Sequence, residues 1–228
     1  MNDGELRALY PFLHGDRQAP ASLDAALARS VADKARQSRE TNERFFAAHG
    51  VALVSAARVL AETYRRGGRL FAMGNGGSSC DAAHIAVEFA HPVTAGRPAL
   101  AAVNLVADLA MISAVANDVG FEHVFVRQLS AQARAGDVLV GISTSGNSPN
   151  LLAAFEKARA MHLATIGLAG GDGGRMMSSG LCDHCLVVPS GSIHRVQECH
   201  VATYHILWDL VHTLLADDRG SAARGPAT

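Results

Sequence analysis

The sequence carries almost no net charge. Its 228 residues include 20 lysines and arginines against 21 aspartates and glutamates, a formal net charge of −1 at pH 7 with neutral histidines. A chain so nearly neutral has no broad basic surface with which to attract nucleic acid or anionic lipid. We therefore expect neither among its partners. Hydrophobic residues at 49% and charged residues at 18% are typical of a globular domain.

Long apolar runs are also lacking, and no secretory leader is expected. We find no run of about 18 apolar residues, the length that a membrane-spanning helix needs. The first ten residues, MNDGELRALY, carry acidic side chains where a leader would carry lysine or arginine. These features predict no membrane span and a cytoplasmic protein.

Cysteine is scarce, which excludes a disulfide framework. The four cysteines, Cys80, Cys182, Cys185 and Cys199, are too few for one in a chain of this length. Cys182 and Cys185 form a CxxC with His184 between them, a pattern typical of half a zinc site or of a redox pair. The same residues also fit the strand-like stretch CDHCLVVP. No second CxxC is present, which favours the strand.

Short apolar strands alternate with helices from residue 69 onward. Strands are expected at 69–73, 99–105, 137–142, 163–169 and 184–189, and helices at 80–91, 108–118, 122–134, 149–161 and 193–216. Alternation of this kind predicts an α/β fold with a parallel sheet covered on both faces. The expected fold class is a single domain with a five-stranded parallel sheet flanked by helices, a flavodoxin-like three-layer plan.

Helical spacing also precedes the first strand. One helix is expected from Ser22 to residue 49, where Gly50 would break it, and a second at 51–66 before a glycine pair. We expect residues 1–22 to form an irregular arm, 23–216 to form one domain that includes the N-terminal helices, and 217–228 to form a flexible tail.

Two loops rich in glycine and hydroxyl side chains follow expected strands. They are GNGGSS (74–79) and STSGNS (143–148), and a helix is expected after each, with Pro149 at a natural first helical position. Backbone N–H groups at a helix start favour an anion, and glycine lets the backbone approach it. The pair therefore points to a phosphate cradle, although each loop alone also fits a capped turn. Neither GxxxxGK[ST] nor GxGxxG is present, which disfavours a P-loop or a dinucleotide fold.

Histidine and glutamate recur at helical spacing after the first loop. His84 and Glu88 are four apart and share a helix face, so they are candidates for metal ligands, an acid/base pair or a surface interaction. In the last expected helix, Gln197, His200 and His205 stand in an apolar segment. His205 is the strongest candidate there for a catalytic or metal-binding residue. The alternative is that it is a buried core histidine hydrogen-bonded to a neighbour. Gln197 and His205 are about 12 Å apart along a helix, which leaves open whether one subunit supplies all the ligands.

These residues match a known family. The chain resembles the sedoheptulose 7-phosphate isomerases (phosphoheptose isomerases), members of the sugar isomerase, or SIS, domain group. The resemblance runs in order from about residue 25 to 216. The matching stretches are GNGGSSCDAAHIAVE (74–88), ANDVGF (116–121), GDVLVGISTSGNS (136–148), GDGGRM (171–176) and RVQECHVATYH (195–205).

The resemblance implies a homotetramer with active sites between subunits, and it implies roles for individual residues. The residues implied to bind the phosphate are Ser143, Thr144, Ser145 and Ser148. Contacts to the sugar fall on Asn75, Gly76, Gly77, Glu88, Asn117, Asp118 and Gln197. A zinc site, one per subunit, falls on His84, Glu88, Gln197 and His205. The catalytic acid/base pair implied is Glu88 and His205.

The expected function is isomerisation of D-sedoheptulose 7-phosphate to D-glycero-D-manno-heptose 7-phosphate through an enediol, for nucleotide-activated heptose biosynthesis. The alternatives are a non-catalytic SIS module that binds a sugar phosphate or a protein partner, of the replication-initiator-binding type, and an isomerase for another phosphoketose. One position departs from the family. Where the isomerases usually carry an acidic residue just before RVQE, this chain has His194.

Overall fold

A computed structural model describes residues 20–223 of the chain, and side chains from 23 to 216. The five strands are β1 (Leu70–Gly74), β2 (Ala102–Asn104), β3 (Val138–Ser143), β4 (Ala164–Gly170) and β5 (His184–Val188). The helices are α2 (Pro20–Arg65), α3 (Gly77–Ala90), α4 (Leu109–Asp118), the 3₁₀ turn η2 (Phe121–His123), α5 (Val124–Gln132), α6 (Pro149–Ala160), α7 (Gly174–Ser178) and α8 (Ile193–Ala223).

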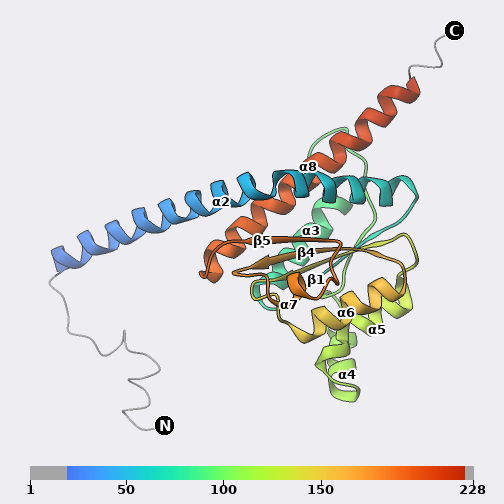
Figure 1. Cartoon of the computed structure of the whole chain (residues 1–228), viewed down its shortest axis with the longest axis horizontal. Coiled ribbons are helices and arrows are strands. Elements are labelled where there is room, and N and C mark those ends of the chain that lie inside the picture. Colours follow the sequence, from blue (N-terminus) through green and yellow to red (C-terminus); the bar gives the residue numbers. More distant parts are fainter. Residues whose placement is uncertain (1–19, 224–228) are drawn as a thin grey trace. The chain divides into compact units, whose positions relative to one another are not determined.

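The strands form one parallel sheet in the order β2-β1-β3-β4-β5. This is the flavodoxin-like order, in which the direction of winding reverses between β1 and β3. The predicted five-stranded parallel sheet with flanking helices is confirmed (Figure 1). Ligands of such sheets bind beyond the carboxyl ends of the strands at the point of reversal, so attention falls on the loops after β1 and β3.

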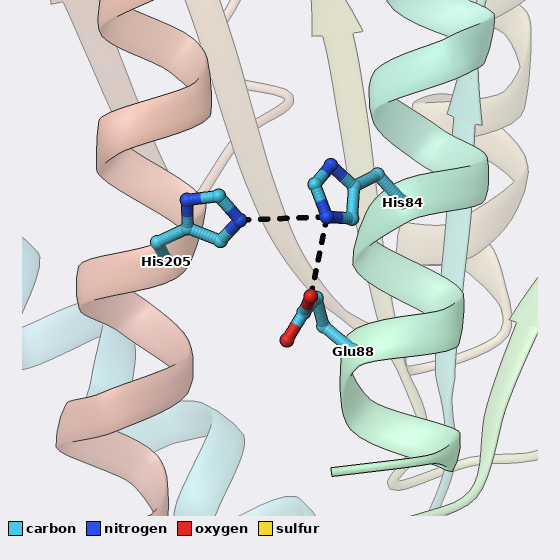
Figure 2. A group of neighbouring side chains, drawn as sticks. All are labelled: His84, Glu88 and His205. Atoms are coloured by element: carbon cyan, nitrogen blue, oxygen red, sulfur yellow. Dashed lines mark hydrogen bonds and ion pairs between the residues drawn. The ribbon is translucent and has the colours of Figure 1, made fainter. Parts of the chain in front are cut away.

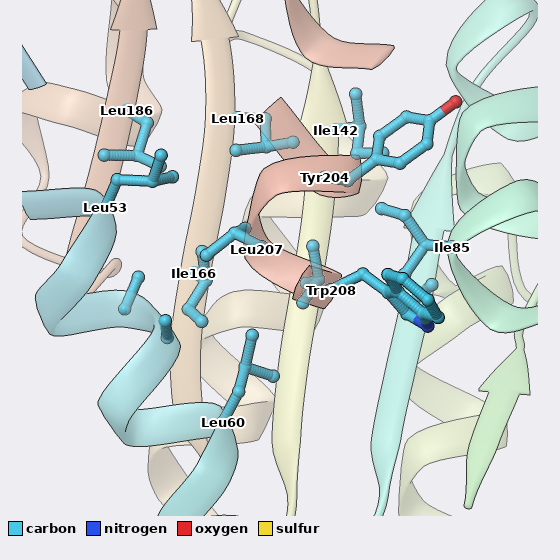
Figure 3. Packing of buried hydrophobic residues seen from close by; sticks show 14 of the residues in the cluster. Leu53, Leu60, Ile85, Ile142, Ile166, Leu168, Leu186, Tyr204, Leu207 and Trp208 are labelled. Carbon is cyan, nitrogen blue, oxygen red and sulfur yellow. The ribbon is translucent and has the colours of Figure 1, made fainter. Parts of the chain in front are cut away.

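Side chains of alternating strand positions build a core on each face of the sheet. On one face, Leu70 and Ala72 of β1 pack with residues of α2, α3 and α8, including Tyr204 and Trp208 (Figure 3). On the other face, Phe71 joins residues of α5 and α6. The period of two along β1 therefore assigns neighbouring residues to opposite layers.

The predicted helix break at Gly50 is wrong, because a single helix, α2, runs from Pro20 to Arg65. Gly50 keeps a helical backbone without a positive φ, and a Cβ placed there would meet no atom within 4 Å. Glycine weakens a helix but does not end one unless the chain turns there. Here the apolar face continues on both sides of Gly50, where Phe45 and Leu53 are both buried.

Helix α2 is also the one helix among the described residues that is long and apolar enough to cross a membrane, judged by length and composition alone. The same test is passed by core helices of soluble proteins. Phe45, Leu53, Ala57 and Leu60 of α2 belong to the buried cluster against the sheet, although only 33% of the apolar window is buried.

The chain divides into two compact units, residues 1–39 and 40–228, with the division inside α2. Neither expected domain boundary coincides with the end of an element, because α2 begins at Pro20 and α8 continues to Ala223. Residues 1–19 of the expected arm and 224–228 of the expected tail lie outside the described part.

The four cysteines are free thiols. Cys185 lies on β5, as the strand interpretation of the CxxC predicts, and Cys182 precedes that strand. Both sulfurs approach Gly167 of β4, whose added Cβ would lie 2.9 Å from Cys182 Sγ and 3.6 Å from Cys185 Sγ. The pair therefore packs in the layer that faces α5 and α6.

Candidate active site

The two glycine-rich loops lie side by side at the carboxyl edge of the sheet. Strands β1 and β3 pair in register with Gly74 opposite Ile142, so the loop leading into α3 and the loop leading into α6 leave the sheet together. They flank the reversal point of the sheet, where this fold class binds its ligands. Two segments about 70 residues apart in the sequence thus form one surface.

The loop after β3 is a compact cradle of hydroxyl and N–H groups. Ser143 Oγ lies 3.1 Å from Ser148 Oγ and accepts a hydrogen bond from the Gly146 N–H at 3.2 Å. Ser148 is the N-cap residue of α6, yet its side chain makes no capping bond. Thr144 is half-buried and Ser145 is exposed. A capped turn would use the Ser148 hydroxyl on the helix, whereas here the hydroxyl faces its neighbour across the loop.

Contacts from the first turn of α7 and from the loop before it hold the cradle in shape. Gly146 has φ +65°, and a Cβ there would lie 2.0 Å from the carbonyl oxygen of Gly173. The Met176 N–H donates to the Gly146 carbonyl at 2.9 Å, and the Arg175 N–H donates to Asn147 Oδ1 at 3.0 Å. Asn147 and Gly173 were missed as site residues, because only the tertiary contact between the two loops reveals their part.

An amide pair joins the two loops. Asn75 and Asn150 each donate from Nδ2 to the other's Oδ1, at 2.9 Å in both directions. Asn150 is almost fully buried in the first turn of α6. Both residues line a cavity of about 370 Å³, together with Gly120, Phe121, Glu122, Ser148 and Pro149. Asn150 had no signal in the sequence, because its role depends on a partner 75 residues away.

Asn117 and Asp118 lie at the C-terminal end of α4, where both are exposed. Asn117 Nδ2 donates to Asp118 Oδ1 at 2.8 Å. Within residues 20–223, no hydrogen bond joins them to the cradle, although the residues that follow them, from Gly120 to Glu122, line the cavity beside Asn75. Their expected sugar contacts stay a prediction.

The structure brings three of the four expected metal ligands together (Figure 2). His84 and Glu88 come from successive turns of α3, and His205 faces them from α8. His84 Nε2 lies 3.2 Å from Glu88 Oε1 and 3.5 Å from His205 Nε2. One ligand atom from each of the three residues lies within 4.8 Å of the other two.

Helices α3 and α8 run parallel and in register, which places Gln197 away from this cluster. Gln197 lies against Gly77, where an added Cβ would be 2.1 Å from its Nε2. Tyr204 bonds to His84 and Trp208 to Glu88, each 120 residues apart in sequence, as Gln197 is from Gly77. Gln197 is therefore about two turns before His205 of the cluster, roughly 12 Å along the helix, and its role as a ligand stays a prediction.

The donor set fits a metal ion. Imidazole nitrogen and carboxylate oxygen are ordinary zinc ligands at about 2.0–2.2 Å, and tetrahedral ligands at that distance are roughly 3.3 Å apart. The His84–Glu88 and His84–His205 distances of 3.2 and 3.5 Å agree with that spacing. A fourth position is left for another ligand or for substrate, which is the usual form of a catalytic site.

Comparison with known proteins decides the family. A family model of the SIS domain matches residues 35–170. A phosphoheptose isomerase of Solidesulfovibrio magneticus is 43% identical over 183 residues, which covers 80% of this chain and 88% of that protein. The chain belongs to the phosphoheptose isomerase family of SIS-domain proteins.

Solved structures agree with this assignment to the phosphoheptose isomerases. The phosphoheptose isomerase of Neisseria gonorrhoeae superposes with a TM-score of 0.77 at 37% identity, covering 82% of this chain and 99% of that one. The enzyme of Francisella tularensis gives 0.78 at 31% identity, covering 82% and 98%. The predicted family is confirmed, as is the prediction that the chain is an isomerase enzyme.

In this phosphoheptose isomerase family member, two further residues, Tyr204 and Asp81, lie close to His84. The Tyr204 hydroxyl lies 2.9 Å from His84 Nδ1. Asp81, one turn before His84, is buried, and burial raises the pKa of its carboxyl, while the nearby Tyr204 hydroxyl and His84 lower it. The pKa of Tyr204 is raised by burial and by the Asp81 carboxyl. Neither residue was expected from the sequence.

The other two histidines of α8 that the sequence singled out, His200 and His194, lie in different surroundings. His200 is fully buried, and its Nε2 lies 3.1 Å from the Ala169 carbonyl oxygen. Burial lowers the pKa of His200 from 6.5 to about 4, so it is a neutral core histidine. His194, the departure from the family pattern, is exposed in the first turn of α8.

Proposed function

We propose that the protein interconverts D-sedoheptulose 7-phosphate and D-glycero-D-manno-heptose 7-phosphate. The observation that carries the proposal is the His84–Glu88–His205 cluster on helices whose starting end borders the hydroxyl-rich cradle. In a heptulose 7-phosphate the reacting carbons and the phosphate lie at opposite ends. A phosphate cradle separated from the acid/base groups suits that substrate, because binding energy at the phosphate can then serve the reaction elsewhere.

Ketose–aldose isomerisation moves a proton between adjacent carbons through an enediol. Glu88 takes the proton from the carbon beside the carbonyl and returns it to the neighbouring carbon. Its Oε1 faces His84, which leaves Oε2 for this step (Figure 2). His205 moves protons between the substrate oxygens at its Nδ1, since its Nε2 faces His84.

Zinc is the metal that this donor set suits best, and His84 would hold it through Nε2 and Glu88 through Oε1, with His205 as a further ligand through Nε2. Binding there would compete with proton transfer by His205, because a zinc-bound imidazole keeps its proton on Nδ1 and has no nitrogen free to accept another. When bound, zinc would polarise the carbonyl and stabilise negative charge on the enediolate. Gln197, or the substrate itself, would complete the coordination. Ser143, Thr144, Ser145 and Ser148 would bind the phosphate, and Asn75, Gly76, Gly77, Asn117 and Asp118 would contact the sugar.

The test is turnover of sedoheptulose 7-phosphate by purified protein, first stripped of metal and then supplied with zinc. We expect Glu88→Gln and His205→Ala to lower kcat by at least 100-fold, since each removes a group that transfers a proton. Glu156→Gln, which changes an exposed carboxylate of α6, is the control and should leave turnover unchanged. Full activity in both site variants would refute the mechanism.

The same assay separates the alternatives. Turnover of another phosphoketose, with none of the heptulose, would assign a different substrate. Binding of the sugar phosphate without any turnover would favour a non-catalytic module. His194 would then be the first residue to replace with an acidic side chain.

We further propose a cytoplasmic homotetramer with sites near subunit boundaries, which supplies heptose phosphate for nucleotide activation. This assembly is the one that the sequence resemblance implies. Light scattering of the purified protein measures its mass directly, and a monomer with full activity would exclude sites shared between subunits.

A further inference from the structure

The two cysteines of the CxxC meet over one glycine of the sheet. Cys185 lies opposite Gly167 in the register of β4 and β5, and β5 is an edge strand. A Cβ added to Gly167 would lie 2.9 Å from Cys182 Sγ and 3.6 Å from Cys185 Sγ. The two sulfurs therefore converge on the space that the absence of a side chain at Gly167 leaves open.

Hydrogen bonds to Thr165 of β4 hold the turn that brings Cys182 to this side of the sheet. Residues three apart on an extended strand face opposite sides, but the chain bends at Asp183. The Asp183 N–H donates to the Thr165 carbonyl at 3.0 Å, and the Thr165 N–H donates to Asp183 Oδ2 at 2.8 Å. Thr165 Oγ1 also donates to the Leu181 carbonyl at 2.9 Å. The backbone on both sides of Cys182 is therefore tied to β4.

We propose that Cys182 and Cys185 form a reversible disulfide when the protein meets a low-molecular-weight disulfide, and that this bond alters the loop that we propose as the phosphate cradle. Both thiols are free and half-buried. A disulfide requires sulfurs about 2.05 Å apart, and two thiols that already share one small space need only side-chain rotation to approach each other. Disulfides of intracellular proteins are usually transient and sense oxidation.

Cys185 is the thiol that reacts first. The neighbouring Cys182 thiol lowers the pKa of Cys185, against burial, whereas Cys185 and burial both raise the pKa of Cys182. The Cys185 thiolate attacks one sulfur of the small disulfide, forms a mixed disulfide and releases one thiolate. Cys182 then gives up its proton and attacks the Cys185 sulfur, which releases the second thiolate. Two protein thiols are thereby oxidised, and one small disulfide is reduced to two thiols.

Met176 connects this pair to the candidate phosphate cradle. Its side chain is fully buried, and its Cε would lie 2.8 Å from the same Cβ on Gly167. Its backbone N–H donates to the Gly146 carbonyl at 2.9 Å. Because a close-packed interior does not accept a displaced atom without moving its neighbours, drawing the sulfurs together should shift Met176 and weaken its contact with Gly146. The effect on substrate rests on the proposed function, but the structural change does not.

Mass spectrometry tests the disulfide. The full chain is incubated with rising ratios of oxidised to reduced glutathione, and the remaining thiols are alkylated. We expect the peptide that contains both cysteines to be two hydrogen atoms lighter and free of glutathione. Cys182→Ser should instead keep one glutathione on Cys185, and Cys80→Ser, which changes an exposed thiol of α3, should form the disulfide as the wild type does. Glutathione retained on Cys185 of the wild type, or two unmodified thiols at the highest ratio, would overturn the proposal.

The link to the cradle has two readouts. In ¹³C NMR of methionine-labelled protein, the Met176 methyl signal, identified by its loss in Met176→Leu, should differ between the reduced and oxidised forms. The KM for sedoheptulose 7-phosphate should rise about fivefold or more on oxidation, and Cys185→Ser should show no response to oxidised glutathione.

An unmoved Met176 signal in the disulfide form, or an unchanged KM, would overturn the link and leave only the disulfide. If the reduced protein turned over no heptulose phosphate, the proposed function would fail, while the mass and NMR results still decided this proposal. Circular dichroism of each variant separates a loss of the disulfide from unfolding.

Discussion

At the scale of single residues, Gly146 decides the form of the loop that we propose to be the phosphate cradle. Its φ of +65° is unfavourable for other residues, and a methyl group there would lie 2.0 Å from the Gly173 carbonyl oxygen. We expect Gly146→Ala to lower the free energy of unfolding by about 2–4 kcal/mol, from backbone strain and the clash together. It should also raise KM for the sugar phosphate, because the Ser143–Ser148 pair depends on this turn.

Gly171→Ala is the matched control for that substitution. Gly171 has φ +67°, almost the same backbone, but open space around its Cα. The variant should therefore lower the free energy of unfolding by about 1–2 kcal/mol, from backbone strain alone, as measured by denaturant unfolding. Its KM should be unchanged. Equal losses in the two alanine variants would show that the contact with Gly173 contributes nothing.

At the scale of elements, Gly50 is a position where a substitution should stabilise helix α2. Gly50 lies inside a continuous helix with no positive φ and no neighbour that a methyl group would meet. We expect Gly50→Ala to raise the free energy of unfolding by about 0.5–1 kcal/mol, since alanine loses less backbone entropy than glycine in a helix. Denaturant unfolding measures the change. Destabilisation would mean that the helix bends at Gly50 in solution.

Among the contacts between elements, the packing of α3 against α8 decides which residues of the candidate site meet. A constant offset of 120 residues aligns Tyr204 with His84 and Trp208 with Glu88. The Trp208 Nε1–H donates to the Glu88 carbonyl at 2.8 Å and ties the last turn of α3 to α8. The separation of Gln197 from the cluster follows from the same register.

At the scale of the whole molecule, His200 links stability to pH. Its pKa is lowered from 6.5 to about 4 by burial, so the unfolded chain binds a proton that the folded one excludes. The contribution is therefore complete above pH 6.5 and lost as pH falls toward 4. Over that range we expect a loss of about 3 kcal/mol from this group.

Denaturant unfolding at a series of pH values, in the wild type and in His200→Gln, measures that contribution. The glutamine amide nitrogen reaches the position of His200 Nε2, so it can still donate to the Ala169 carbonyl, but it does not titrate. The stability of the variant should therefore fall less steeply between pH 6.5 and 4. Parallel curves for the two proteins would show that His200 is protonated in the folded state.

Local patterns were enough to predict much of this protein. The strand-and-helix alternation predicted the parallel sheet, and the loops at 74–79 and 143–148 marked the carboxyl ends of two of its strands, because strand ends and turns depend on near neighbours in the chain. The spacing of His84 and Glu88 placed them on one helix face for the same reason. The break at Gly50 was wrong, because glycine marks a turn only where the backbone takes a turn.

Tertiary structure alone decided the rest. The approach of His205 to His84, the amide pair of Asn75 and Asn150, and the contact of Tyr204 with His84 all join residues from different elements. No local spacing encodes such contacts, since they arise from the order of the strands and the parallel register of two helices. The sequence by itself determined which chemical groups were available and where the chain turns. Packing determined which of those groups meet, because burial of the apolar faces sets the position of each helix on the sheet.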